Sequence, residues 1–163
     1  MFGRLFKKQE VKEISLVTPM SGEVISLEEV PDPVFSQKMM GDGIAVIPTD
    51  GTVVSPVNGE IIQVFPTKHA IGILGDNDAQ ILIHIGIETV SLQGEGFTVN
   101  VAKGDRVKQG DPLMQVDLNI IEEKASSAIT PIIITNSDEM SEIEKKSEKQ
   151  VKAGEQEILF VRK

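Results

Sequence analysis

Short runs of valine and isoleucine, separated by glycine, proline and aspartate, set the main constraint on how this chain folds. Branched side chains favour strands, whereas glycine, proline and aspartate favour turns. Because helical stretches do not alternate with these runs, the pattern disfavours a parallel α/β sheet. The runs predict strands at 23–25, 44–47, 52–54, 60–65, 112–116, 132–134 and 158–161.

An internal repeat supports the same fold class. Residues 17–25 (VTPMSGEVI) match residues 54–62 (VSPVNGEII) at an offset of 37. Duplicated strand–turn–strand units indicate a sandwich or barrel built from two related halves. We therefore expect an all-β protein, an antiparallel β-sandwich or barrel-like fold with one or two short helices. A helix is expected at 118–127, and a solvated helical turn followed by a strand within 137–157.

The chain has 163 residues, which fits one domain with its own core. We expect a folded domain over residues 13–163 and a separate segment over residues 1–12. That segment is either a flexible tail or an amphipathic helix that lies on an anionic membrane. Its apolar side chains are Met1, Phe2, Leu5 and Phe6, and its basic ones are Arg4, Lys7 and Lys8.

Composition excludes several classes of function. The chain has no cysteine, which rules out disulfides, cysteine-based zinc sites and cysteine nucleophiles and fits a cytoplasmic location. No apolar run reaches the ~18 residues that span a bilayer. A net charge of −9 and the absence of Trp and Tyr weigh against nucleic acid and are compatible with a basic protein partner.

The only two histidines, His69 and His84, lie in runs that read as one β-hairpin. With a two-residue loop at Asp76-Asn77, the two rings lie directly opposite, with Cβ atoms roughly 4.5–5.5 Å apart. A three-residue loop or a bulge would break this register. The alternate isoleucines of 81–85 are assigned to the core. The outer face then carries His69, Ile71, Ile73, Leu82 and His84, an apolar patch typical of a binding site.

Two adjacent imidazoles suit phosphoryl transfer. A neutral imidazole can attack phosphorus, and a second one can donate a hydrogen bond to the phosphoryl oxygens. Thr67 shares the face of His69 and would add a hydroxyl. Since no His-x-x-x-His spacing exists, no intrinsic metal site is expected. The alternative that stays open is zinc held by His69 and His84 at an interface, with a carboxylate from a partner.

Several stretches resemble one family. Residues 82–90 (LIHIGIETV) and 92–97 (LQGEGF) resemble the signature around the phosphorylated histidine of glucose-type enzyme IIA, from the bacterial phosphoenolpyruvate-dependent sugar phosphotransferase system. The similarity covers roughly residues 13–162. Supporting matches are residues 30–35 (VPDPVF), 41–43 (GDG), 65–70 (FPTKHA) and 130–131 (TP).

The resemblance implies an antiparallel β-sandwich that carries a phosphoryl group without a cofactor. His84 matches the histidine that is phosphorylated on Nε2, His69 the histidine that stabilises the phosphoryl group, and Thr67 a supporting hydroxyl. Family members accept phosphate from the histidine of HPr and pass it to a cysteine of a IIB domain. Because this chain lacks cysteine, we expect a free-standing IIA protein, with a domain cut from a longer permease as the alternative.

The resemblance also implies a partner-docking face. Asp32 and Glu88 fall where the family carries acidic groups that meet basic residues of the partners, although aspartate is the usual residue at position 88. Some members also regulate other proteins, so regulatory partners are a further expectation. The apolar members of the docking face would be Val34, Phe35, Met39, Met40, Phe65, Ile71 and Leu82.

A carrier domain of the biotinyl or lipoyl type is the alternative function. Residues 54–61 and 104–111 resemble half-motifs of such domains. These domains need a lysine at a hairpin tip, and residues 37–39 (QKM) are a poor match to the biotinylation sequence Met-Lys-Met. The mass of the intact protein would distinguish biotin, lipoate and phosphate.

Overall fold

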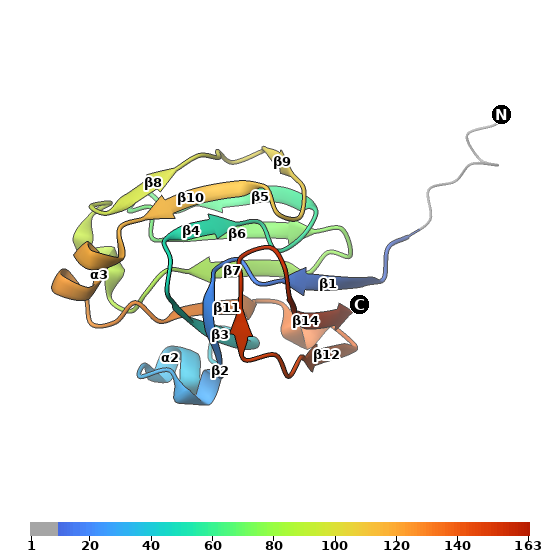
Figure 1. The fold of residues 1–163 in the computed structure, drawn as a ribbon. Helices are drawn as coiled ribbons and strands as arrows, with labels where there is room; N and C mark the ends of the chain where they lie inside the picture. Colours follow the sequence, from blue (N-terminus) through green and yellow to red (C-terminus); the bar gives the residue numbers. More distant parts are fainter. Residues whose placement is uncertain (1–9) are drawn as a thin grey trace.

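Antiparallel strands form most of the regular secondary structure in the computed structural model, which describes residues 10–163 (Figure 1). All seven predicted strands are present, and further short ones lie between them. The elements in chain order are β1 (Glu13–Val17), β2 (Gly22–Ser26), η1 (Leu27–Glu29), α2 (Pro33–Ser36), β3 (Asp42–Pro48), β4 (Thr52–Val54), β5 (Gly59–Val64), β6 (Ala70–Gly75), β7 (Gln80–His84), η2 (Thr89–Leu92), β8 (Phe97–Val99), β9 (Arg106–Val107), β10 (Pro112–Val116), α3 (Leu118–Lys124), β11 (Thr130–Ile134), η3 (Ser137–Glu139), β12 (Glu142–Lys145), β13 (Gln150–Val151) and β14 (Glu157–Arg162).

The strands form one large sheet and two small ones. The large sheet has eight strands in the order β13-β2-β3-β11-β7-β6-β5-β9. The small sheets have three strands each, in the orders β1-β14-β12 and β4-β10-β8. The main core joins apolar side chains of the large sheet to those of both small sheets. This arrangement confirms the predicted all-β, antiparallel sandwich.

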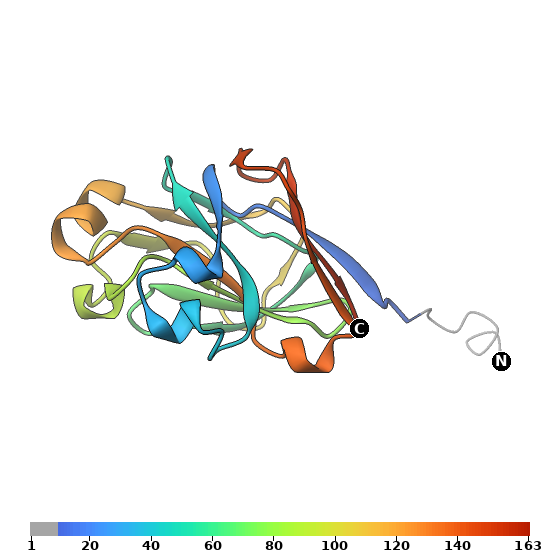
Figure 2. The same ribbon diagram turned by 90° about the horizontal axis from the view of Figure 1, so that it is seen from below.

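A second, smaller core lies on the other face of the large sheet. The segment with η1 and α2 covers this face (Figure 2), where Leu27, Val30 and Phe35 pack against Ala45 and other side chains of the sheet. Asp32 caps α2, because its carboxylate accepts the N–H of Val34 at 2.9 Å. This segment brings its own side chains beside the end of β7.

The internal repeat is a structural duplication. The N–H of Val17 donates to the carbonyl of Pro56 at 3.1 Å, and the N–H of Val54 donates to the carbonyl of Pro19 at 2.9 Å. At the offset of 37 these are equivalent bonds, exchanged between the two copies. The predicted duplication is therefore present, and its copies bond to each other.

A second repeat was missed in the sequence. Residues 106–111 (RVKQGD) and 150–155 (QVKAGE) each contain a two-residue strand followed by a glycine turn. These strands, β9 and β13, pair with β5 and β2 at opposite ends of the large sheet. The strands β2 and β5 are equivalent strands of the first repeat. Each copy of the second repeat therefore pairs with one copy of the first.

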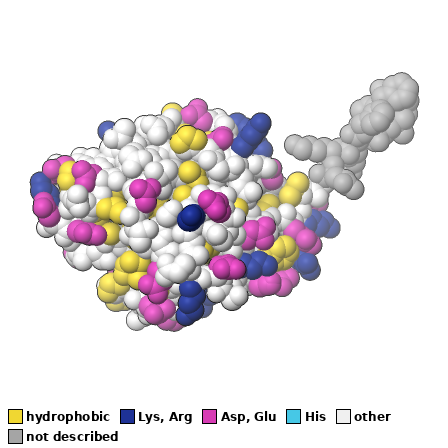
Figure 3. Space-filling view, in the orientation of Figure 1, with side chains coloured by type: hydrophobic (Ala, Val, Ile, Leu, Met, Phe, Trp, Pro, Cys, Tyr) yellow, Lys and Arg dark blue, Asp and Glu magenta, His cyan; other side chains and the backbone are white. Residues whose placement is uncertain are grey.

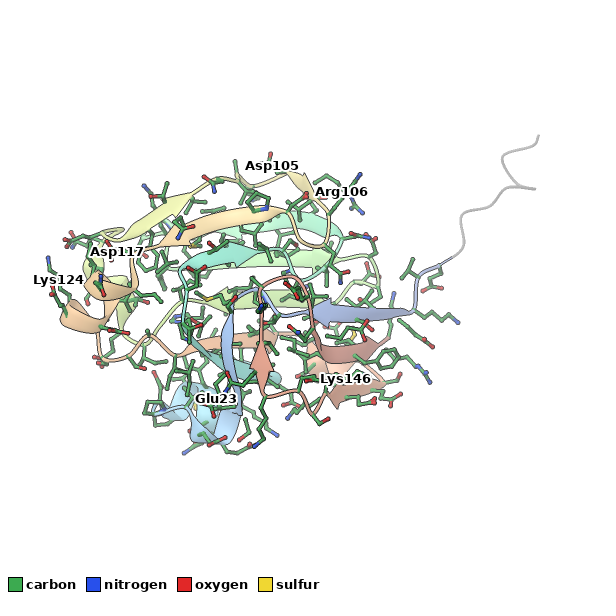
Figure 4. All side chains as sticks on the ribbon, viewed as in Figure 1. Glu23, Asp105, Arg106, Asp117, Lys124 and Lys146 are labelled. Carbon is green, nitrogen blue, oxygen red and sulfur yellow. The ribbon has the colours of Figure 1, made fainter. Side chains whose placement is uncertain are left out.

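Both predicted helical segments are present, but the first of them, α3, ends earlier than predicted. Asp117 begins α3 by accepting the N–H groups of Asn119 and Ile120, and the helix ends at Lys124 rather than at residue 127. Figure 4 shows Asp117 and Lys124 at the two ends of α3. Within residues 137–157, the predicted helical turn is η3 and the predicted strand is β12, followed by β13.

Residues 1–9 lie outside the described residues, and with them most of the segment predicted at 1–12. Residues 10–12 lead into β1 without regular secondary structure. Among residues 10–163, no helix has the length and apolar character needed to cross a membrane.

The β6–β7 hairpin has a three-residue loop, so the register predicted from a two-residue loop is wrong. Gly75 donates its N–H to the carbonyl of Ala79 at 2.8 Å. Asp78, inside the loop, has a left-handed φ of 69°. One extra loop residue shifts every pair by one position, and His84 therefore lies opposite Ala70.

This shift also moves Ile71 from the predicted outer face to the core. Ile71 and Ile73 are fully buried in the main core together with Ile81, because alternate residues of a strand share a face. Leu82 stays on the outer face, but the segment with η1 and α2 leaves it only 6% exposed. Neither Ile71 nor Leu82 is the exposed docking residue that was predicted.

Candidate functional site

His84 is the last residue of β7, and its ring has a defined protonation pattern. Its Nδ1 lies 2.9 Å from the carbonyl oxygen of Gly86. A carbonyl oxygen only accepts hydrogen bonds, so Nδ1 must carry the proton. In the neutral ring, the lone pair is then on Nε2.

Gly86 is required for this hydrogen bond. Its φ is 75°, a left-handed conformation that favours glycine. A Cβ atom here would lie 2.6 Å from Cγ2 of Thr89 and 2.7 Å from the carbonyl oxygen of Ser127. The chain therefore passes closely enough to orient the ring only because this residue lacks a side chain.

His69 reaches His84 although the two are not cross-strand partners. It lies in the bend before β6, directly after Lys68, whose φ of 63° is left-handed. Its side chain therefore does not follow the alternation of the strand. The two ring centroids are 5.0 Å apart, with an angle of 80° between the ring planes. The predicted meeting of the two histidines is thus present, for a different local reason.

Thr67 supports His69. Its Oγ1 lies 2.6 Å from Nδ1 of His69, within hydrogen-bonding distance. When the hydroxyl donates to Nδ1, the proton of the neutral ring is on Nε2. The two histidines would then present complementary atoms, a lone pair on His84 and an N–H on His69.

Aromatic rings hold both imidazoles. The ring of Phe35 packs against His84 with centroids 4.9 Å apart, and the ring of Phe65 packs edge-on against His69 at 5.4 Å. Phe35 is only 4% exposed. Phe35 therefore packs in the smaller core and against His84, and it is not exposed to solvent as expected for a docking residue.

The histidines open onto a cavity of about 590 Å³. The predicted Met39 does not line it, but is 69% exposed nearby on the α2 side. Figure 3 shows hydrophobic side chains gathered where α2 lies. The cavity is lined by Asp32, Val34, Phe35, Met40, Phe65, Pro66, Thr67, His69, His84, Glu88, Thr89 and Val90.

Burial keeps both imidazoles neutral near pH 7. It lowers the pKa of His69 to about 4, and electrostatic repulsion between the protonated forms of His69 and His84 acts in the same direction. Burial also lowers the pKa of His84, against the opposing effects of the Gly86 carbonyl and the Asp32 carboxylate. A neutral imidazole is the form that can act as a nucleophile.

Two carboxylates lie at this cavity. Asp32 belongs to the cap of α2, and Glu88 follows the loop at Gly86. Glu88 is exposed and accepts a hydrogen bond from the hydroxyl of Ser126. The two predicted acidic positions are therefore brought together from separate parts of the chain.

Within the part of the chain that the structure describes, no three His, Cys, Asp or Glu residues form a group that could hold a metal ion. Two imidazoles alone leave a zinc shell incomplete. Zinc shared with a partner therefore stays a prediction.

Lys38 does not resemble a biotinylated or lipoylated lysine. It lies in the turn after α2 rather than at the tip of a β-hairpin. Its Nζ forms ion pairs with Glu28 at 3.3 Å and Asp42 at 3.6 Å. This geometry does not favour the carrier-domain alternative.

The prediction of site residues missed four neighbours of the histidines. Gly86 accepts the hydrogen bond from His84, and Pro66, Thr89 and Val90 line the cavity. Their signal in the sequence was proximity to a histidine or to Thr67. Val90, 55% exposed, extends the apolar rim.

Residues 14–140 match the family model described as phosphoenolpyruvate-dependent sugar phosphotransferase system, EIIA 1. The chain belongs to this family. As an EIIA protein, it is a phosphoryl-transfer component of the sugar phosphotransferase system, as the resemblance in the sequence indicated.

Relatives of this EIIA protein match over nearly the whole chain. The glucose-specific EIIA component of Oceanobacillus iheyensis is 58% identical over 163 residues, covering 99% of both chains. The component of the same name from Staphylococcus aureus is 50% identical over 163 residues, covering 99% of this chain and 98% of the relative. The solved glucose permease IIA of Mycoplasma capricolum is 38% identical and superposes with a TM-score of 0.86, covering 94% and 98%.

Proposed function

We propose that this EIIA protein carries a phosphoryl group on Nε2 of His84, accepted from phosphorylated HPr and passed to a cysteine of a IIB domain. One observation carries the proposal: the Nδ1 proton of His84 is committed to the Gly86 carbonyl at 2.9 Å, while the ring of His69 lies 5.0 Å away. This arrangement supports Nε2 of His84 as the nucleophilic nitrogen, with a second imidazole close enough to assist it.

In the first step, the Nε2 lone pair of His84 attacks the phosphorus of the donor phosphohistidine. A bond forms between Nε2 and phosphorus, and the donor's nitrogen–phosphorus bond breaks, returning its electron pair to the donor ring. His84 keeps its Nδ1 proton throughout. The lowered pKa favours this step, because a protonated ring would have no lone pair.

His69 stabilises the charge on the phosphoryl group. In the tautomer set by donation from the Thr67 hydroxyl, its Nε2–H can donate to a phosphoryl oxygen. A phosphoryl group carries about −1.5 to −2 charges at pH 7, so a positioned donor lowers the barrier to transfer. In the second step a IIB thiolate attacks phosphorus, and the bonding electron pair returns to Nε2 of His84.

The rim of the cavity suits partners with an apolar centre and basic groups around it. Val34, Met39 and Val90 are 39%, 69% and 55% exposed. Asp32 and Glu88 add negative charge. Complementary charge speeds encounter and selects partners, while apolar contact excludes water.

We place the carrier domain at residues 13–163 and the exchange in the cytoplasm. The relatives named as glucose-specific support a IIB domain of a glucose permease as the acceptor.

Regulatory proteins that bind only one phosphorylation state would use the same rim. Affinity capture by the phosphorylated and unphosphorylated protein, compared side by side, tests that extension.

The test is reconstituted phosphorylation. The protein is incubated with radiolabelled phosphoenolpyruvate, enzyme I and HPr, and the labelled peptide is mapped. We expect one acid-labile phosphate on His84 in the wild type and no label in His84→Gln. Label that persists in His84→Gln would contradict the assignment.

The His69→Gln variant separates the roles of the two rings. Glutamine is similar in size but cannot present the same ring N–H, so we expect labelling to persist and onward transfer to slow by about 10²-fold. Transfer to IIB at the wild-type rate would remove His69 from the mechanism.

The identity of the acceptor is tested with the wild-type protein. Transfer to the IIB of another sugar permease, but not of a glucose permease, would overturn the proposed acceptor.

A further inference from the structure

Two hydrogen bonds hold the main chain of Ile87, the residue before Glu88. The N–H of Ile87 donates to the carbonyl of Ser127 at 2.9 Å, and the N–H of Ser126 donates to the carbonyl of Ile87 at 3.2 Å. These bonds form a small antiparallel bridge between the loop after β7 and the loop after α3. Glu88 itself has a left-handed φ of 61°. The bridge fixes where its side chain starts.

Ser126 is fixed equally well from the other side. The N–H of Ala125 donates to the carbonyl of Ile121 at 2.9 Å, which closes the last turn of α3. Ile121 is fully buried in the main core. The main chain that leads to Ser126 is therefore anchored to the core.

Ser126 does not line the histidine cavity, whereas Glu88 does. The hydroxyl of Ser126 donates to the Glu88 carboxylate. An exposed glutamate has three rotatable bonds and would otherwise sample many rotamers. A donor on a rigid neighbour restricts it to one direction before any partner arrives.

We propose that Ser126 is a positioning residue, whose hydroxyl holds the Glu88 carboxylate at the rim of the histidine cavity to meet a basic side chain of the phosphoryl donor. The inference deepens the proposed function and rests on it. The Ser126 hydroxyl anchors the end of the Glu88 side chain. Ordering the carboxylate beforehand reduces the entropy lost on binding.

The test compares KM and kcat for phosphorylated HPr. For Ser126→Ala we expect KM to rise about two- to fivefold, since exposed ion pairs contribute little each and this variant keeps the carboxylate. The value of kcat should not change, because the histidines are untouched. Ser126→Thr keeps a hydroxyl and should restore most of the wild-type KM.

A matched control removes another hydroxyl that contacts Glu88, that of Ser91 in η2. Ser91 donates to the main-chain carbonyl of Glu88 at 2.8 Å and does not touch its carboxylate. Ser91→Ala should leave KM near the wild-type value. An equal rise in KM for Ser91→Ala would attribute the effect to the loop and overturn the inference.

The second arm is a double-mutant cycle. In a Glu88→Ala background the carboxylate is gone, so adding Ser126→Ala should produce no further rise in KM. A wild-type KM for Ser126→Ala, or the same rise with and without Glu88, would overturn the inference.

The same double-mutant cycle is repeated with the affinity for unphosphorylated HPr, measured by titration calorimetry. A wild type that binds HPr but takes no label contradicts the proposed function alone, and the calorimetric cycle then decides the role of Ser126.

Discussion

Replacing His69 by glutamine should change how the stability of the protein depends on pH. In the folded protein, burial and the neighbouring His84 lower the pKa of His69 to about 4, from an ordinary value of 6.5. The unfolded chain takes up a proton near pH 6.5, while the folded protein does so only near pH 4. The free energy of unfolding therefore falls as the pH drops from about 6.5 to about 4, and this term is constant outside that range.

The size of the effect follows from the two pKa values. Linkage gives a loss of about 2 kcal/mol at pH 5 and about 3 kcal/mol at pH 4, relative to pH 7.5. The His69→Gln variant has no group that titrates at this position. Its stability should fall less than that of the wild type over the same range, by about these amounts.

Urea denaturation followed by far-ultraviolet circular dichroism measures the difference, because the chain has no Trp or Tyr for fluorescence. With a slope of about 2 kcal/mol per molar urea, the difference at pH 5 amounts to about 1 M in the midpoint. Carboxylates titrate in both proteins, so their contribution cancels in the comparison. Parallel pH curves for the two proteins would refute the reasoning that burial keeps His69 neutral.

Two further substitutions test the surroundings of the histidines. Gly86→Ala should lower the free energy of unfolding by about 3 kcal/mol, because a Cβ here meets Thr89 and strains a left-handed residue. The control is Gly104→Ala, where φ is 95° but no atom lies within 4 Å of the added Cβ. In the same urea titration, this control should lower the free energy of unfolding by only about 1 kcal/mol. Asn77→Ala should lower the free energy of unfolding, measured by thermal unfolding, by about 2–3 kcal/mol. The reason is that the buried amide of Asn77 donates to the carbonyls of Lys12 and Val161 and accepts the N–H of Ala79. An equal loss of stability in the control Asn100→Ala, at an exposed position, would contradict this.

Strand positions were predictable because their cause is local. Branched side chains and turn-forming residues lie next to each other in the sequence, and their preferences do not require knowledge of distant partners. The repeat of residues 17–25 at 54–62 was also readable, since the two copies share Val, Pro, Gly, Glu and the final Ile at matching positions. The repeat of 106–111 at 150–155 escaped notice because its strands have two residues each and depend on pairing with β5 and β2 for their existence.

The register of the histidine hairpin was not predictable from side-chain alternation. A loop of two residues and a loop of three give opposite faces to every residue of one strand. The three-residue loop is selected by the left-handed Asp78 and by Asn77, whose amide bonds to chain segments far away in sequence. Ile71 consequently lies in the core rather than on the docking face.

The amino-acid sequence by itself determined that this protein is built of antiparallel strands in duplicated halves and that His69 and His84 lie at the start and the end of one hairpin. Only the tertiary structure decided which atoms of these residues meet, and that Ser126 reaches Glu88. The physical reason is the range of the forces involved. Backbone preferences act between neighbours in the chain, whereas hydrogen-bond partners and burial arise only when separate segments pack against each other.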